Sequence, residues 1–177
     1  MKKLFTAFFA IALLASTISL QAQDKPAPSP FSKVEQKVGT TDLTIEYSRP
    51  GVKGRTIMGE LVPYDKRWRT GANAVTKVTT SKDMMVEGQN LPAGTYALMT
   101  TPGKSSWKVH FFTYVDGSGR SYPADAKPAL TVSATPHSTG DVKVESFLIY
   151  VDMLRDDSAT LKMAWDNVVV PVSLGVK

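Results

Sequence analysis

The sequence contains no cysteine. This absence excludes disulfide bonds, thiolate metal sites, cysteine nucleophiles and the lipid-modified cysteine of a bacterial lipoprotein. A secreted domain of this size can rely on its hydrophobic core, because the disulfide-dense class is mostly smaller. Histidine is nearly as scarce: His110 and His137 are the only two, and they lie on different segments. We expect no metal site and no cofactor, since a zinc site would need several carboxylates to complete it.

The motifs of the common enzyme classes are also lacking. No G-x-S-x-G nucleophile elbow occurs, and Gly51–Gly54 is neither a phosphate-binding loop nor a dinucleotide-binding fingerprint. Two carboxylates can support glycoside hydrolysis when their environments differ, and Glu46 and Asp166 both fall at polar positions of expected strands. A hydrolase that uses Glu46, Asp166 or His110 stays open as an alternative. Acids on a solvated strand face are commonplace, so the sequence favours a protein that is not an enzyme.

A strong charge of one sign is missing as well. The formal net charge is +5, and Lys2 and Lys3 contribute two of these charges from a segment that we expect to be removed. The three that remain are too few for a nucleic-acid-binding protein, which normally shows a strong basic footprint within a recognisable module. We therefore expect no nucleic-acid partner.

Long apolar runs are confined to the N-terminus. Leu4–Ala15 is almost wholly apolar, follows Lys2 and Lys3, and leads into a polar exit, Ser16–Ala22, that ends in a small residue. This layout is typical of a secretory signal peptide, and the run is shorter than the roughly 20 residues that span a bilayer. We expect residues 1–22 to be a signal peptide cleaved near Ala22, which predicts a periplasmic or secreted protein with no membrane span after cleavage.

The remaining chain has the residue pattern of a β protein. Residues 23–30 form a Pro-rich spacer, and residues 31–177 form one domain. Short alternating segments recur with turn residues between them and show almost no helical periodicity, which predicts an all-β fold, a single antiparallel β-sandwich of about eight or nine strands. We expect strands at residues 41–48, 74–81, 84–86, 95–101, 107–114, 129–135, 142–153, 159–165 and 168–174.

Two of these strands carry a local irregularity. In the segment 142–153 the apolar positions change parity near Ser146, which predicts a bulge or burial on both faces. In the last strand Pro171 lacks a backbone donor, which predicts a place at a sheet edge.

One long basic and aromatic loop interrupts the strand pattern. The segment from Tyr47 to Asn73, YSRPGVKGRTIMGELVPYDKRWRTGAN, holds six arginines and lysines together with Tyr64 and Trp68. A connection this long without regular structure is usually either functional or disordered. Its apolar and aromatic content argues against disorder, so we expect Trp68 and Ile57 to pin it to the body of the domain.

This loop is the candidate ligand-binding site. An arginine offers planar paired donors for a carboxylate or phosphate, a tryptophan face can stack on a sugar, and an asparagine supplies both a donor and an acceptor. We expect a small anionic or carbohydrate-like ligand, or an envelope protein partner. The alternative is a purely structural envelope module, in which carboxylates or backbone carbonyls occupy the arginines and tie the loop down. The candidate binding residues are Arg49, Arg55, Trp68, Arg69 and Asn73.

Four of these segments carry a family resemblance. The stretches YSRPGVKGR, LVPYDKRWRTGAN, LPAGTYALMTTPG and AWDNVVVPV resemble, in order and spacing, the domain of unknown function 2911 family of exported bacterial proteins. The resemblance covers Ser29 to about Leu174. It implies a single exported domain, with WRTGAN as its most recognisable patch, and it brings no catalytic or binding residue with it.

Overall fold

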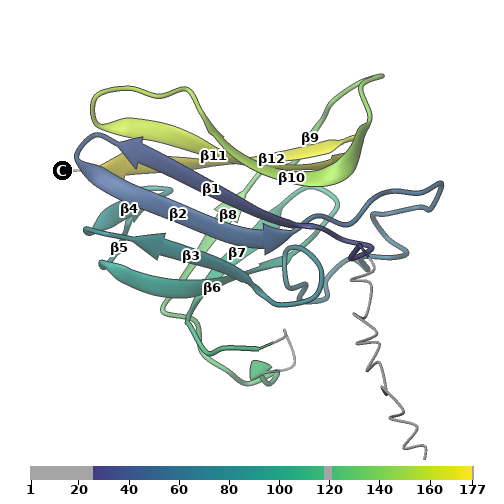
Figure 1. Ribbon diagram of the computed structural model, residues 1–177, viewed down its shortest axis with the longest axis horizontal. Coiled ribbons are helices and arrows are strands. Elements are labelled where there is room, and N and C mark those ends of the chain that lie inside the picture. The colour runs from purple at the N-terminus through teal and green to yellow at the C-terminus, as the bar shows by residue number, and fades with distance from the viewer. Residues whose placement is uncertain (1–25, 118–120, 177) are drawn as a thin grey trace, which may run out of the picture.

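The structure is a computed structural model that describes residues 26–117 and 121–176. Two antiparallel sheets lie face to face in it (Figure 1). The first sheet has the strand order β1-β2-β3-β6-β7-β8. Its strands are β1 (Phe31–Val38), β2 (Thr41–Ser48), β3 (Thr76–Thr80), β6 (Gly94–Thr101), β7 (Trp107–Thr113) and β8 (Leu130–Ala134).

The second sheet has the order β10-β11-β12-β4-β5, and a short β9 also pairs with β12. The sheets approach each other along one side through β1 and β10, and along the other side through β8, β12 and β5. The strands of this sheet are β4 (Met84–Val86), β5 (Gln89–Leu91), β9 (His137–Ser138), β10 (Val144–Asp152), β11 (Ser158–Asp166) and β12 (Val168–Val176).

The architecture confirms the predicted all-β antiparallel sandwich with one long loop, but it has 12 strands in the described residues instead of eight or nine. The additional strands are β1, β5 and β9. The strand β1 pairs with β2 along its whole length, yet its alternation is weak because it lies at a sheet edge and carries charged side chains that discourage further pairing. The strands β5 and β9 are only three and two residues long, too short to show a period.

The predicted irregularity near Ser146 is confirmed, because the register between β10 and β11 shifts between Val144 and Leu148. The prediction that Pro171 marks an edge strand is wrong, since β12 lies inside the second sheet. The physical reason is local. On the side away from β11, β12 pairs with β9 at Val168 and Val169 and with β4 only from Leu174 onward. Pro171 lies in the gap between these two partners, where a missing donor costs no ladder bond.

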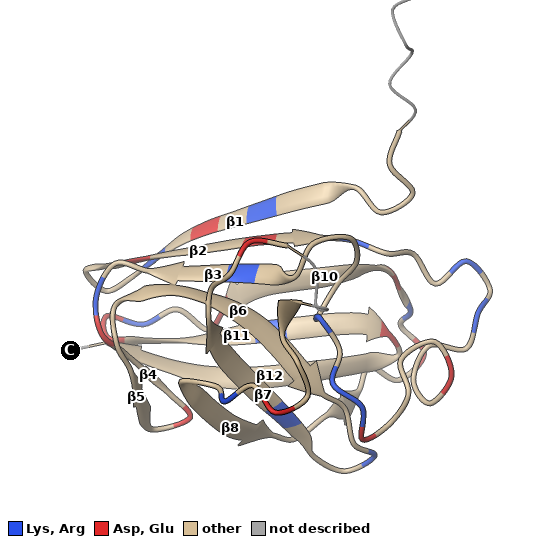
Figure 2. Cartoon of the chain, turned by 90° about the horizontal axis from the view of Figure 1, so that it is seen from below, with Lys and Arg blue, Asp and Glu red and all other residues tan. Residues whose placement is uncertain are grey.

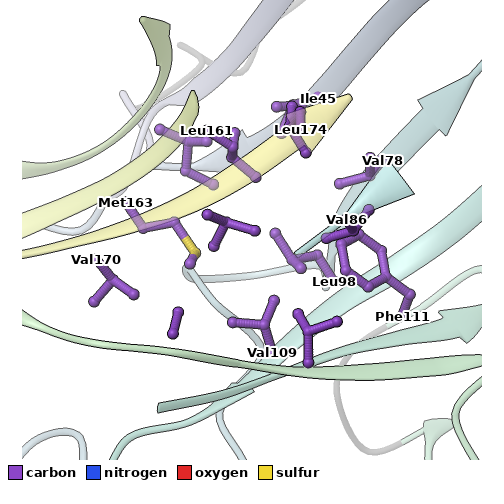
Figure 3. Packing of buried hydrophobic residues seen from close by; sticks show 14 of the residues in the cluster. Ile45, Val78, Val86, Leu98, Val109, Phe111, Leu161, Met163, Val170 and Leu174 are labelled. Atoms are coloured by element: carbon purple, nitrogen blue, oxygen red, sulfur yellow. The ribbon is translucent and has the colours of Figure 1, made fainter. Parts of the chain in front are cut away.

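The core fills the space between the two sheets (Figure 3). Alternate residues of each strand point inward, as period-two side-chain geometry requires, and this buries side chains from both sheets. Labelled examples in Figure 3, all at most 5% exposed, are Ile45, Val78, Val86, Leu98, Val109, Phe111, Leu161, Met163, Val170 and Leu174.

One buried tyrosine joins the sheets by hydrogen bonds. Tyr47 Oη donates to the carbonyl oxygen of Ile149 (3.2 Å) and accepts from the backbone N–H of Ile149 (2.9 Å). Because β10 is an edge strand, the backbone groups on its outer side have no neighbouring strand to pair with. The hydroxyl of Tyr47 supplies both missing partners.

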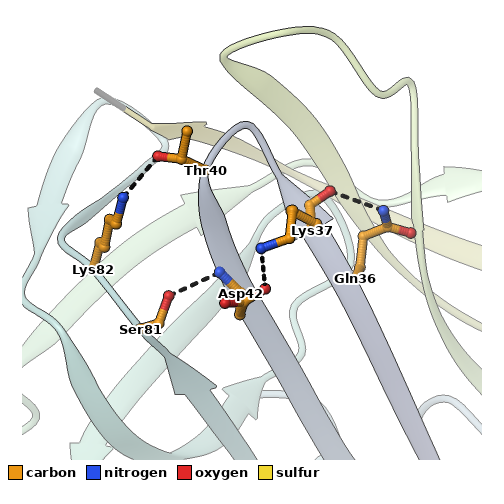
Figure 4. A network of polar contacts seen from close by, with 6 residues as sticks. All are labelled: Gln36, Lys37, Thr40, Asp42, Ser81 and Lys82. Atoms are coloured by element: carbon orange, nitrogen blue, oxygen red, sulfur yellow. Dashed lines mark hydrogen bonds and ion pairs between the residues drawn. The ribbon is translucent and has the colours of Figure 1, made fainter.

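At the end of the sandwich where β1 turns into β2, polar contacts join two turns (Figure 4). Asp42 pairs with Lys37 across the hairpin (2.6 Å), and the backbone N–H of Asp42 donates to Ser81 Oγ (2.8 Å). Lys82 Nζ donates to Thr40 Oγ1 (2.9 Å). The candidate site lies elsewhere, where β2 ends and the long loop begins.

Candidate functional site

The β2–β3 loop, residues 49–75, has only isolated bridges for secondary structure but is anchored at several points. Trp68 and Thr100 of β6 exchange two backbone hydrogen bonds, 2.7 and 2.9 Å long. Ile57 is fully buried. The expectation that Trp68 and Ile57 fix this loop to the body therefore agrees with the structure, and Figure 1 shows the first part of the loop extending beyond the strand ends.

The start of the loop is joined to β10. Val52 donates its backbone N–H to Glu145 O (2.8 Å), and Phe147 donates to Pro50 O (2.9 Å). Arg49 Nε donates to Phe147 O at 2.8 Å and Arg49 Nη2 to Ser146 O at 3.4 Å. The loop thus covers the irregular start of an edge strand, whose free backbone groups would otherwise lack partners.

The segment Trp68–Asn73 has an unusual backbone. Thr70 has φ 55° and Asn73 has φ 57°, a region that a β-branched threonine seldom adopts. Thr70 is fully buried and held by its surroundings, since its carbonyl accepts from Thr76 Oγ1 at 2.5 Å. Gly71 has φ 152°, and a Cβ there would lie 3.1 Å from Ser48 O. Packing and hydrogen bonds hold this segment in a shape that its own preferences disfavour.

Aromatic side chains pack together beside the segment Trp68–Asn73. The rings of Trp68 and Trp165 are stacked, with centroids 5.7 Å apart and planes 16° apart, and Phe147 packs edge-on against both. Trp68 Nε1 donates to Gly71 O at 3.1 Å. Trp68 is half-buried, whereas Trp165 is only 2% exposed.

A cavity of about 400 Å³ is lined by Trp68 and Trp165. We call it the loop cavity. Its walls come mainly from the β2–β3 loop, with Pro28 and Ser29 from the segment before β1 and Trp165 from the end of β11. Its volume lies in the range of small-molecule pockets, roughly 300–1,000 Å³. Its apolar lining residues are Pro28, Pro50, Leu61, Val62 and the two tryptophans.

The charged residues that line the loop cavity are all cationic. Lys53, Arg55 and Arg69 line it, and none of the three forms an ion pair with a carboxylate in the described part of the chain. Glu145 reaches this end of the loop, but its Oε1 accepts the backbone N–H of Lys53 at 2.9 Å. Figure 2 shows lysine and arginine positions on the part of the loop that extends beyond the strands.

Backbone carbonyls hold the two arginines in place. Arg55 donates from Nε to Val52 O (3.0 Å) and from Nη2 to Gly51 O (2.5 Å). Arg69 Nη1 donates to Asn73 O at 2.8 Å. Each guanidinium has five N–H donors, so both retain donors for another partner. Carbonyl oxygens orient these groups without cancelling their charge.

Two further residues that line the cavity carry polar groups. Asn73 Nδ2 donates to Ser29 O (3.1 Å) and to Ser48 Oγ (3.2 Å). The indole N–H of Trp165 is buried and has no hydrogen-bond acceptor among the described residues. A buried donor without a partner costs about 1–3 kcal/mol, so an acceptor that reached this nitrogen would be stabilising.

The structure brings together four of the five candidate binding residues. Arg55, Trp68, Arg69 and Asn73 all line the loop cavity. Arg49 does not, since its guanidinium lies against β10 carbonyls.

Sequence reasoning missed Lys53, Trp165 and the Pro28–Ser29 wall. Lys53 sits in the same basic run and could have been included on that ground. Nothing local to Trp165 or to the Pro-rich segment indicates that they meet this loop.

The residues of the alternative hydrolase site are not brought together. Glu46 lies on β2 and pairs with Lys77 of β3. His110 lies on β7, three strands further across the same sheet. Asp166 ends β11 in the other sheet, with Oδ1 3.9 Å from Lys143 Nζ. Among the described residues, Glu46 borders one hollow and His110 borders another, and Asp166 lines neither of them.

His110 instead borders a second hollow of about 530 Å³ on the outer face of the first sheet. Its ring nitrogens lie 3.0 Å from Thr101 Oγ1 and 2.9 Å from Thr131 Oγ1. Burial lowers the pKa of His110, and the nearby charges of Arg67 and Lys108 lower this pKa further. Arg67 also stacks over Phe112, 5.1 Å from the ring centroid, and donates to Tyr122 O.

Within residues 26–117 and 121–176, no group of three or more histidines, cysteines, aspartates or glutamates is placed to hold a metal ion. The same residues include no helix long and apolar enough to cross a membrane. The expected signal peptide, residues 1–22, lies outside the described part of the chain.

Comparison with known proteins agrees with the family resemblance. No curated protein and no solved structure gives a significant match. A protein-family match extends over residues 29–174, nearly the whole described domain, and the family is described as "Protein of unknown function (DUF2911)". The chain is therefore a member of the DUF2911 family.

Proposed function

We propose that this protein is an exported, non-enzymatic binding domain that holds a small anionic ligand in the loop cavity. One observation carries the proposal: Lys53, Arg55 and Arg69 line a single cavity, and no carboxylate in the described chain pairs with them. Export is supported by the signal-peptide pattern of residues 1–22.

The electrostatic argument is direct. Lysine and arginine side chains in folded proteins are usually solvated or paired, and a cluster of like charges around one hollow raises the local concentration of anions. Arg55 and Arg69 are pre-oriented by carbonyl oxygens, so little side-chain entropy is lost when they bind an anion. Hydrogen bonds between charged partners are also stronger than those between neutral ones.

Equilibrium titration of the purified protein with acetate, phosphate and citrate at low ionic strength tests this function. Trp68 and Trp165 line the cavity, so intrinsic fluorescence reports occupancy, and calorimetry gives the affinity independently. We expect saturable binding of at least one anion. Arg55→Ala and Arg69→Ala should each weaken it about 10-fold or more, because a hydrogen bond to a charged group contributes roughly 1.5–3 kcal/mol.

Arg155→Ala is the matched control. Arg155 is exposed, bonds the carbonyl of its own neighbour Leu154, and lies in the β10–β11 turn at the other end of these strands. This variant should bind as the wild type does. If no anion binds, or if the Arg155 variant loses as much affinity as the cavity variants, the loop arginines serve only to shape the loop and the purely structural module is favoured.

A further inference from the structure

We infer that the ligand of the loop cavity is a carboxylated sugar, a uronate-type ring, and not a simple inorganic anion. The inference rests on the proposed function and adds the chemical class of the ligand. It is carried by the mixture of groups that line the cavity: cationic side chains, apolar side chains and uncharged polar groups.

The cationic lining residues fit a carboxylate. A carboxylate has two oxygens in one plane, and arginine presents planar N–H pairs that match them. Arg55 and Arg69 each keep N–H groups beyond those that bond Gly51, Val52 and Asn73 carbonyls. Lys53 adds a third positive charge without such directional demands.

The apolar lining residues provide more apolar surface than an inorganic anion would need. Trp68, Leu61 and Pro50 line the cavity together with the cations, and Leu61 is 45% exposed. An inorganic phosphate or sulfate has no apolar surface to place against these groups. A pyranose ring has one, because its C–H bonds form apolar faces that pack against aromatic and aliphatic side chains while its hydroxyls point outward.

The uncharged polar groups fit hydroxyls. The bonds from Asn73 Nδ2 to Ser29 and Ser48 leave Asn73 Oδ1 as an acceptor, and a sugar hydroxyl can donate to it. The indole N–H of Trp165 has no acceptor among the described residues, and a sugar oxygen can accept from it. Because this nitrogen is shielded from solvent, the oxygen that reaches it has to displace part of the cavity wall.

A calorimetric series of four ligands on the wild-type protein separates the contributions of the carboxylate, the ring and the hydroxyls to affinity. Glucuronate combines a carboxylate, a ring and hydroxyls. Cyclohexanecarboxylate lacks the hydroxyls, glucose lacks the carboxylate, and acetate lacks the ring. We expect glucuronate to bind at least 10-fold more tightly than each of the other three, with its affinity reduced at least 10-fold in Arg69→Ala.

Every other outcome of this series overturns the inference, and some outcomes also overturn the proposed function. Equal binding of acetate and glucuronate overturns the inference but leaves the proposed function, since the site then takes a simple anion. Cyclohexanecarboxylate binding as tightly as glucuronate also overturns it and indicates an apolar acid. Binding of glucose alone overturns both proposals. A complete absence of binding in this series overturns the inference, and it overturns the proposed function as well if phosphate and citrate also fail to bind.

Two tryptophan variants test the hydroxyl contact directly. Trp165→Phe removes the indole N–H but keeps an aromatic ring in the core, and Trp107→Phe is the control, because Trp107 is equally buried but does not line the cavity. We expect Trp165→Phe to lower glucuronate affinity several-fold more than acetate affinity, while Trp107→Phe leaves their ratio unchanged. An unchanged ratio in both variants contradicts the contact with Trp165.

Discussion

Replacing Arg49 by alanine should lower stability and leave ligand binding intact, although Arg49 belongs to the same basic run as Arg55 and Arg69. Its guanidinium donates to Phe147 O at 2.8 Å, and its bond to Ser146 O at 3.4 Å is long. A hydrogen bond from a charged donor contributes about 1.5–3 kcal/mol, and a bond longer than 3.2 Å contributes less. Since Arg49 is only partly buried, we expect a loss of about 1–2 kcal/mol.

Urea unfolding measures this loss. The midpoint should fall while the slope with denaturant stays constant, because the surface exposed on unfolding does not change. A thermal scan should show a decrease of about 2–8 °C, since 1 kcal/mol shifts the melting temperature of a domain this size by about 2–4 °C. Arg155→Ala, which removes an exposed arginine that bonds only the carbonyl of its neighbour Leu154, should keep the wild-type midpoint.

The binding series that distinguishes Arg55 and Arg69 is then repeated on Arg49→Ala. Wild-type affinity in a destabilised protein is the expected result. An unchanged unfolding midpoint together with lost anion binding would refute the reasoning, because Arg49 would then serve the ligand and not the edge of β10.

Three further predictions concern groups around the site and the core. Tyr47→Phe should destabilise the protein by about 1–3 kcal/mol, because it strands a buried backbone N–H at Ile149; Tyr150→Phe is the control in the same urea assay. Gly71→Ala should weaken anion binding and lower the melting temperature, because a Cβ would lie 3.1 Å from Ser48 O at φ 152°; normal values for both would show that this backbone adjusts freely. The pKa of His110 is lowered in the folded state, so its contribution to stability is present above about pH 6.5 and is lost as pH falls below that value; His110→Gln should remove this part of the acid-side decrease in unfolding free energy.

Much of the fold can be predicted from the sequence because most strands alternate between inward apolar residues and outward polar residues. The segments around Ile45 and Phe111 show this period clearly and form β2 and β7. The edge strand β1 was missed since both of its faces carry polar residues, and only pairing with β2 reveals it. The prediction from Pro171 was wrong because the gap between β9 and β4, the two short strands that pair with β12, exists only in the assembled sheet.

The candidate site also has residues that the sequence predicts and residues that only the folded structure reveals. The basic and aromatic residues that line the cavity are close in sequence, so Arg55, Trp68, Arg69 and Asn73 could be proposed together. Arg49 could not be separated from them, since nothing in its local sequence shows that the carbonyls of an edge strand lie beside it. Trp165 enters from a distant strand, and only the packing of the two sheets brings its ring onto Trp68.

The most direct measurement follows the indole N–H signals of the three tryptophans by ¹⁵N-edited NMR during a glucuronate titration. Trp68 and Trp165 line the loop cavity. Trp107 packs edge-on against Trp68 but does not line the cavity. A saturable shift that is largest at Trp165 and Trp68, and that is lost in Arg69→Ala, is the predicted result. A saturable shift confined to Trp107, or no shift at all, would contradict a uronate-binding site in this loop.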